Sequence, residues 1–191
     1  MPATETRDQI LSIAHRLLVA EGLSALSFDA IARRLGRSKQ AVLYWFPTRQ
    51  DLLAALFLPA LQAEAEAVTV ALDGAEDRPA AIARFVQGLV AFHSQDLDRF
   101  RLMYLLPQTS RGRPGTGMLD HVHTVTDGLY GALARHLDPA DPDAARPKAL
   151  ALHAAVLGLM MMQGLAEAVD DPLKHGADEL ADAMIDALTR P

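Results

Sequence analysis

The sequence contains no cysteine and no apolar run that approaches the roughly 20 residues of a membrane-spanning helix. The first absence excludes disulfide bonds, a cysteine nucleophile, thiol redox sensing and cysteine-ligated zinc. The segment 1–9 is polar and lacks the apolar region of a signal peptide. We therefore expect a cytoplasmic protein, whose 191 residues suffice for one large domain or two small ones.

Basic charge is scarce overall but concentrated near the N-terminus. The net charge of −6 by itself argues against a nucleic-acid partner. Residues 1–53, however, hold seven Lys/Arg and five Asp/Glu, net +2, whereas residues 54–191 hold eleven and nineteen, net −8. Five basic residues and no acidic one lie between Asp29 and Asp51. This distribution favours an N-terminal segment that meets a polyanion, although a solvated charge cluster would give the same pattern.

The N-terminal third predicts four helices with recognisable ends. Thr6 and Gln9 have the spacing of a capping box, and Gly22 is a plausible helix stop. The remaining signals are Ser27 as the cap of a second helix that ends at Gly36, Ser38 as the cap of a third helix over 39–46, Pro47 as its stop, and Thr48 as the cap of a long fourth helix from Arg49. Pro59 lies inside the fourth helix and predicts a kink or break there.

The rest of the chain is rich in alanine and also helical. Its apolar periodicity predicts helices at about 78–94, 96–106, 117–137, 143–169 and 174–189. A segment rich in Pro and Gly, 107–117, separates two of them and is expected to be the most mobile. The expected fold class is therefore all-α with about nine helices: a three-helix DNA-binding domain over 1–50, and a helical bundle for ligand binding and dimerisation over 51–191.

The second and third predicted helices carry the spacing of a helix-turn-helix. Such a unit needs a small residue where its helices cross, a residue tolerant of positive φ in the turn, and an apolar anchor on the second helix. Ala32, Gly36 and Val42 supply these three in order. An ordinary helical hairpin would be the alternative, but the two serine caps and the uncompensated basic residues favour DNA binding.

The stretch 6–57, TRDQILSIAHRLLVAEGLSALSFDAIARRLGRSKQAVLYWFPTRQDLLAALF, resembles the N-terminal domain of the tetracycline-repressor (TetR) family. The resemblance covers all four helices, including the F-P-x-[RK]-x-x-L-L entry to the fourth. It implies a homodimer that binds a pseudo-palindromic operator in double-stranded DNA. It also implies release of that DNA when a small-molecule effector enters the C-terminal domain. Separately from the resemblance, we expect no enzyme activity, cofactor or metal.

Carried over by position, the resemblance places the helix from Lys39 in the major groove, where its N-terminal part reaches base edges. Gln40 is the candidate for direct readout of adenine, and Ala41 for contact with a thymine methyl group. The full set of candidate DNA contacts is Ser27, Arg37, Ser38, Lys39, Gln40, Ala41, Tyr44, Trp45 and Arg49.

Within this set, Lys39, Arg49 and Ser27 are assigned to phosphates. Two positions depart from the family pattern. Leu43 stands where a phosphate-contacting tyrosine is usual, so Tyr44 takes that role from another direction, and Arg37 replaces an apolar turn residue. Phe46 is interpreted as core, whereas Trp45 fits a core position or a DNA contact equally well.

The predicted helix 143–169 is apolar nearly all round, so it must be covered on two sides. One side can face its own core, and the other then needs a second subunit. Together with the last helix this predicts a two-fold interface of four helices. Its candidate residues are Leu157, Met161, Leu165, Leu180, Met184 and Leu188.

Polar or polarisable residues on apolar stripes of the C-terminal part are the candidates for an effector pocket. These are His93, Met103, His123, His153 and Met160. The alternative for each histidine is a satisfied core or interface position, and for the methionines adaptable core packing. No Ser/His/Asp constellation, phosphate loop or paired metal ligand is spaced for catalysis, which weakens an all-helical enzyme or carrier as a rival. A third hypothesis is a DNA-binding protein whose C-terminal part responds only to another protein.

Overall fold

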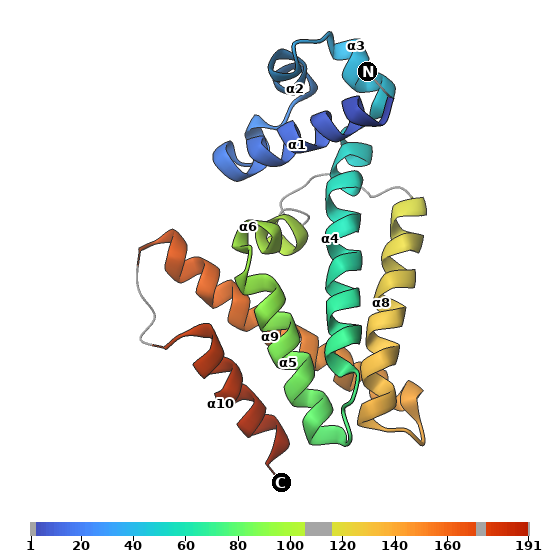
Figure 1. The fold of residues 1–191 in the computed structure, drawn as a ribbon, viewed down its shortest axis with the longest axis vertical. Coiled ribbons are helices and arrows are strands. Elements are labelled where there is room, and N and C mark those ends of the chain that lie inside the picture. The colour runs from blue at the N-terminus through green and yellow to red at the C-terminus, as the bar shows by residue number, and fades with distance from the viewer. Residues whose placement is uncertain (1–2, 106–115, 171–174, 191) are drawn as a thin grey trace. The chain divides into compact units, whose positions relative to one another are not determined.

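The computed structural model describes residues 3–105, 116–170 and 175–190. Within these ranges the chain forms nine α-helices, one 3₁₀-helix and one π-helix, and no strand, which confirms the all-α fold class. The α-helices are α1 (Ala3–Glu21), α2 (Phe28–Leu35), α3 (Lys39–Trp45), α4 (Arg49–Leu72), α5 (Arg78–Ser94), α6 (Leu97–Phe100), α8 (Thr116–Leu137), α9 (Pro142–Ala168) and α10 (Ala177–Thr189) (Figure 1). The 3₁₀-helix η1 is Leu23–Ala25 and the π-helix η2 is Arg101–Leu105.

The chain divides into two compact units. The first, the N-terminal unit, comprises Met1–Ala60 and Arg101–His121; the second, the C-terminal unit, comprises Leu61–Phe100 and Val122–Pro191. The division crosses α4 between Ala60 and Leu61 and crosses α8 between His121 and Val122. The functional division expected at residue 50 stays a prediction, because compactness alone does not report function.

The N-terminal unit has a core made only of apolar side chains. Its first three α-helices are α1, α2 and α3, and their contacts join α1 to α2 and α2 to α3. Its buried residues are Ile10, Ile13, Ala14, Leu17, Leu26, Ile31, Ala32, Val42, Phe46 and Leu52. Phe46 is thus core, as its position favours, while Trp45 is half-buried against the same cluster.

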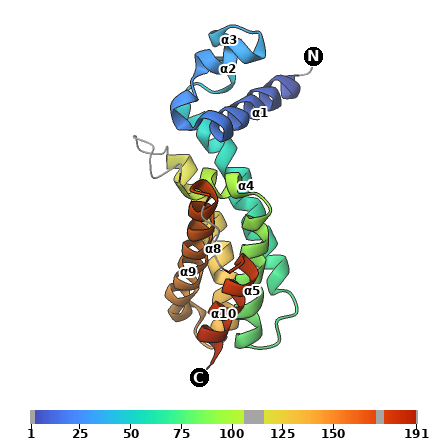
Figure 2. The same ribbon diagram turned by 90° about the vertical axis from the view of Figure 1, so that its left-hand side faces the viewer.

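In the C-terminal unit, α5 lies at the centre of the contacts. It packs against both α10 and α9, and α10 also contacts α9 (Figures 1 and 2). The inward faces follow helical spacing: Phe85, Val86 and Leu89 on α5 are completely buried, as are Val156 and Met160 on α9.

The expected start of one helix is wrong, and two other helices differ from expectation inside their limits. The first helix begins at Ala3 instead of being capped by Thr6, because nothing between Pro2 and Thr6 interrupts a helix and Thr6 is one of its interior residues. The helix expected over 96–106 is divided into a four-residue α6 and the π-helix that follows it. No break occurs at Pro59, since α4 runs on to Leu72; a proline removes one backbone hydrogen bond, and burial of Leu52 and Val68 on either side holds the helix together.

The other limits agree closely with the expectations. Gly22 and Gly36 end α1 and α2 with positive φ, and Ser27, Ser38 and Thr48 precede α2, α3 and α4. The mobile segment expected at 107–117 lies almost wholly outside the described residues. By length and composition α4 and α9 each pass as membrane-crossing candidates, but so do core helices of soluble proteins.

Candidate nucleic-acid interface and buried polar centre

The turn between α2 and α3 is fixed by local interactions. Ser27 Oγ accepts a hydrogen bond from the N–H of Ala30 at 3.1 Å, and Ser38 Oγ accepts one from Ala41 at 3.3 Å. Gly36 adopts φ of 67°, which an L-residue avoids, and the Arg37 N–H then bonds back to the Ala32 carbonyl at 3.0 Å. The two caps and the glycine therefore set the angle at which α3 leaves α2.

The outer face of α3 carries the predicted DNA contacts in exposed positions. Lys39, Gln40 and Tyr44 are exposed, and Tyr44 has 78% of its surface accessible, the largest value among the exposed apolar and aromatic side chains of the described residues. Tyr44 and Trp45 meet edge to face with ring centroids 5.2 Å apart. Val42, on the opposite face, is completely buried and anchors the helix. The helix therefore presents polar and aromatic groups outward on a rigid support.

A cavity of about 280 Å³ opens where the first turns of α2, α3 and α4 meet. Its lining residues are Leu26, Ser27, Phe28, Asp29, Lys39, Arg49 and Leu52, and we call it the α2–α4 pocket. The three residues assigned to phosphates from the sequence, Ser27, Lys39 and Arg49, all line it. The hydroxyl of Ser27 accepts from Ala30 and keeps its own O–H as a donor.

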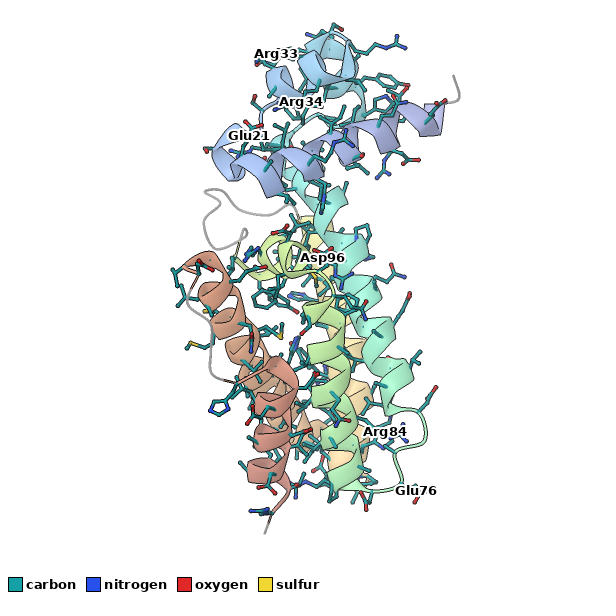
Figure 3. All side chains as sticks on the ribbon, turned by 60° about the vertical axis from the view of Figure 1, so that its left-hand side comes forward. Glu21, Arg33, Arg34, Glu76, Arg84 and Asp96 are labelled. Atoms are coloured by element: carbon teal, nitrogen blue, oxygen red, sulfur yellow. The ribbon has the colours of Figure 1, made fainter. Side chains whose placement is uncertain are left out.

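One charge in the α2–α4 pocket is negative. Asp29 Oδ2 lies 2.8 Å from Lys39 Nζ, and the two side chains are 63% and 50% exposed. A second ion pair joins Arg34 of α2 to Glu21 at the end of α1 (Figure 3). Arg33 and Arg37 are exposed. The N-terminal unit thus carries its charge on the outside, around an apolar core.

Three buried polar side chains gather inside the C-terminal unit instead. Glu64 on α4, His93 on α5 and His153 on α9 are almost completely inaccessible to solvent. Glu64 Oε1 accepts hydrogen bonds from His93 Nε2 at 3.0 Å and from His153 Nε2 at 3.1 Å. The half-buried Tyr130 on α8 lies with its hydroxyl 3.0 Å from His153 Nδ1. We call these four residues the polar centre.

The protonation of the polar centre follows from its geometry. Burial raises the pKa of the Glu64 carboxyl, but the hydrogen bonds from His153 and His93, together with the electrostatic attraction of the two rings, outweigh burial and hold the pKa at about 2. Burial, and then the charge of Glu64, raise the pKa of Tyr130 above its usual value. Tyr130 is therefore a protonated phenol that shares a hydrogen bond with His153 Nδ1, while the ionised Glu64 can only accept from His153 Nε2.

Aromatic rings enclose the two imidazoles. Phe92 and Phe100 meet the ring of His93 edge to face at 5.1 and 5.2 Å, and Phe85 meets the ring of His153 at 6.1 Å. Such surroundings lower the local dielectric constant and strengthen the charge-assisted hydrogen bonds.

The structure brings together only part of the predicted effector residues. His93 and His153 meet through Glu64, and Met160 is buried in the same unit. Met103 is buried in η2, which belongs to the N-terminal unit, and His123 is exposed on α8. Glu64 was missed, although a signal exists, because Leu61, Glu64, Val68 and Leu72 share one stripe at helical spacing. Among the described residues no three His, Asp or Glu side chains are arranged to hold a metal ion.

The candidate interface residues of α9 and α10 differ in exposure. Met161, Leu165 and Leu188 are exposed, at 46%, 56% and 40%, while the remaining three, Leu157, Leu180 and Met184, are half-buried. The exposed side of α9 continues as a face without charge over much of its length. Its members are Leu150, Ala151, Ala154, Ala155, Gly158, Met161, Met162 and Leu165. We call this the α9 face.

Comparison with known proteins agrees with these features. Residues 10–56 match the family model of bacterial regulatory proteins of the tetR family. No curated protein matches the sequence closely enough to count as a relative.

Similar solved structures cover nearly the whole chain. A protein of unknown function from Rhodococcus sp. RHA1 has a TM-score of 0.73 at 24% identity, covering 95% of this chain and 92% of its own. The regulatory protein SCO4313 has a TM-score of 0.77 at 23% identity, covering 98% and 97%. The TetR-family regulator PfmR from Thermus thermophilus has a TM-score of 0.71 at 21% identity, covering 96% and 95%. The N-terminal helices thus match the tetR family model over residues 10–56, and the chain as a whole shares the all-helical fold of these solved structures.

Proposed function

We propose that the protein is a cytoplasmic repressor that binds a pseudo-palindromic operator as a homodimer and is released by a small-molecule effector. The observation that carries the DNA-binding part is the α2–α4 pocket, which gathers Ser27, Lys39 and Arg49 beside the exposed face of α3. A pocket lined by a hydroxyl donor and two cations suits a backbone phosphate. The adjoining exposed helix suits the major groove.

The roles of the contacts follow from their exposure and chemistry. Gln40 reads adenine through its side-chain amide, and the half-buried Ala41 meets a thymine methyl group. Tyr44 and Trp45 contact phosphate or sugar at the end of α3, and Arg37 and Ser38 contact the backbone beside the turn. The phosphate contacts set the register of α3, and the base contacts supply the sequence preference.

The second copy needed for a palindromic site is placed on the α9 face and on α10. An apolar surface along a 27-residue helix is unfavourable in water and is stabilised by burial against an equivalent helix. The exposed small residues, Ala151, Ala154, Ala155 and Gly158, allow a close approach of the two helices. Met161, Leu165 and Leu188 then supply most of the apolar area, with Leu157, Leu180 and Met184 at the margin.

The effector part rests on the polar centre, which places hydrogen-bonding groups of four helices inside an apolar bundle. Small-molecule sites are apolar with a few convergent polar groups, and His93, His153 and Tyr130 fit that description. Met160 contributes adaptable apolar surface beside them. Met103 and His123 remain further candidates.

Selection from a random duplex library, followed by affinity measurements at two salt concentrations, tests DNA binding. We expect an enriched inverted repeat, and an affinity that falls steeply with salt because several phosphates are neutralised. Binding that ignores sequence in a correctly folded protein would contradict the proposal and favour an incidental basic surface. The effector is tested by mass spectrometry of small molecules that co-purify with the protein, followed by their addition to the operator complex. Release of DNA only by another protein would favour a C-terminal part that responds to a protein.

Sedimentation of charge variants tests the dimer separately. Met161→Glu and Leu165→Glu place carboxylates on the α9 face and are expected to give monomers. Val70→Glu is the matched control, because Val70 is 69% exposed and belongs to α4, which contributes no residue to the proposed interface. Dimers of unchanged stability in both α9 variants would contradict this interface.

A further inference from the structure

The α2–α4 pocket holds a carboxylate where the proposed function requires a phosphate anion. We infer that Asp29 is a positioning residue that acts as an electrostatic brake on DNA binding: it holds Lys39 across the pocket in free protein and must release it to the phosphate. The inference rests on the proposed DNA-binding function and identifies a residue that limits affinity instead of supplying it.

The geometry makes the exchange possible. The Asp29–Lys39 pair is closed at 2.8 Å, yet both side chains are about half exposed or more. Ion pairs of this kind contribute little to stability, so a phosphate can replace the carboxylate as the partner of Lys39 without disturbing the fold. Because Asp29 belongs to the lining itself, its charge stays beside the pocket and repels the incoming phosphate after Lys39 has turned away.

The simpler interpretation is that Asp29 only stabilises α2. It lies in the first turn, where a negative charge interacts favourably with the helix dipole. That role would alter thermal stability and leave the dependence of DNA binding on salt unchanged. A brake predicts the opposite pattern, so the two roles can be separated by experiment.

The test measures binding of the full-length protein to a random-sequence duplex of about 30 base pairs, between about 50 and 200 mM salt. Asp29→Asn removes the charge and preserves the shape of the side chain. We expect it to bind about threefold to tenfold more tightly than wild type at the lower salt concentration, with a steeper dependence on salt. Asp8→Asn removes the same charge from an exposed position on α1 and serves as the matched control.

A double-mutant cycle with Lys39→Ala shows whether Asp29 acts through Lys39. The gain from Asp29→Asn should be clearly smaller when Lys39 is absent. The inference is overturned if wild type binds the duplex but Asp29→Asn binds equally or more weakly, if Asp8→Asn gives the same gain, or if the cycle shows no coupling. If wild type shows no salt-dependent binding to any duplex, the proposed DNA-binding function is wrong, and the inference about Asp29 is wrong with it.

Discussion

The two compact units use charged side chains in opposite ways. In the N-terminal unit the core is entirely apolar, and Lys39, Arg49 and their neighbours lie at the surface or line an open pocket. In the C-terminal unit a carboxylate is completely buried and is held by two imidazoles. Exposed charges stay hydrated and exchange partners easily, whereas a buried charge is stabilised only by fixed partners.

This difference matches a division of labour. A unit that binds and releases a polyanion needs cations whose partners can change, as the Asp29–Lys39 pair illustrates. A unit that must hold four helices in one arrangement can use a single shared acceptor, because Glu64 ties α4 to α5 and α9. The predictions below test whether the two kinds of charge differ in energy as this comparison requires.

Removing the buried carboxylate should have the largest effect. Glu64→Ala leaves two buried imidazoles facing a hole, and breaking a buried pair in this way lowers the free energy of unfolding by about 3–5 kcal/mol. Urea denaturation followed by circular dichroism measures the change. Glu66→Ala, two residues along the same helix but exposed, is the control and should change stability by less than about 0.5 kcal/mol. Equal effects of the two variants would remove the contrast between the units.

Acid should remove part of the same stabilisation. The pKa of Glu64 is about 2 in the folded protein against a reference value of 4.5, so its contribution is complete above pH 4.5 and is lost as the pH falls towards 2. The stability difference between wild type and Glu64→Gln should therefore shrink by about 2 kcal/mol between about pH 6 and pH 3. Denaturation curves of both proteins across this range measure it. A difference that stays constant or grows on acidification would contradict a buried, ionised carboxylate.

Replacing a glycine by alanine should change the free energy of unfolding in opposite directions in the two units. Gly36→Ala forces a Cβ into the left-handed region at the helix-turn-helix and should cost about 1–2 kcal/mol. Gly128→Ala lies inside α8, where an added Cβ meets nothing within 4 Å, and should stabilise by about 0.5–1 kcal/mol. Thermal denaturation of both variants measures the two changes. Destabilisation by Gly128→Ala would show that α8 is packed more closely than described.

The helix-turn-helix could be predicted from the sequence because its determinants are local. Ser27, Gly36 and Ser38 act on backbone groups within a few residues, and Val42 follows from spacing alone. Ser27, Lys39 and Arg49, which the sequence assigns to phosphates, line one pocket, although the sequence alone did not predict that pocket. The predicted start of α1 at Thr6 is wrong. Thr6 has capping-box spacing, but the helix already begins at Ala3, so Thr6 is not its cap.

The polar centre could not be predicted in the same way. Glu64 is 29 residues from His93 and 89 residues from His153 in the sequence. The periodicity of a single helix does not reveal partners that lie so far apart along the chain. The sequence placed both histidines on apolar stripes but treated each of them separately. The ion pair between Asp29 and Lys39 could not be predicted either, because the distance between the two side chains depends on how α2 and α3 cross.

The central claim is that α3 reads bases while the α2–α4 pocket binds backbone phosphate. Binding of Gln40→Ala and Arg49→Ala to the selected operator and to its single-base variants, across a range of salt, tests it most directly. Gln40→Ala should lose about 1–3 kcal/mol of discrimination at one base pair without a change in salt dependence. Arg49→Ala should weaken binding to all sequences alike and reduce the slope against salt by about one for each phosphate that is no longer neutralised. The reverse pattern would contradict the account.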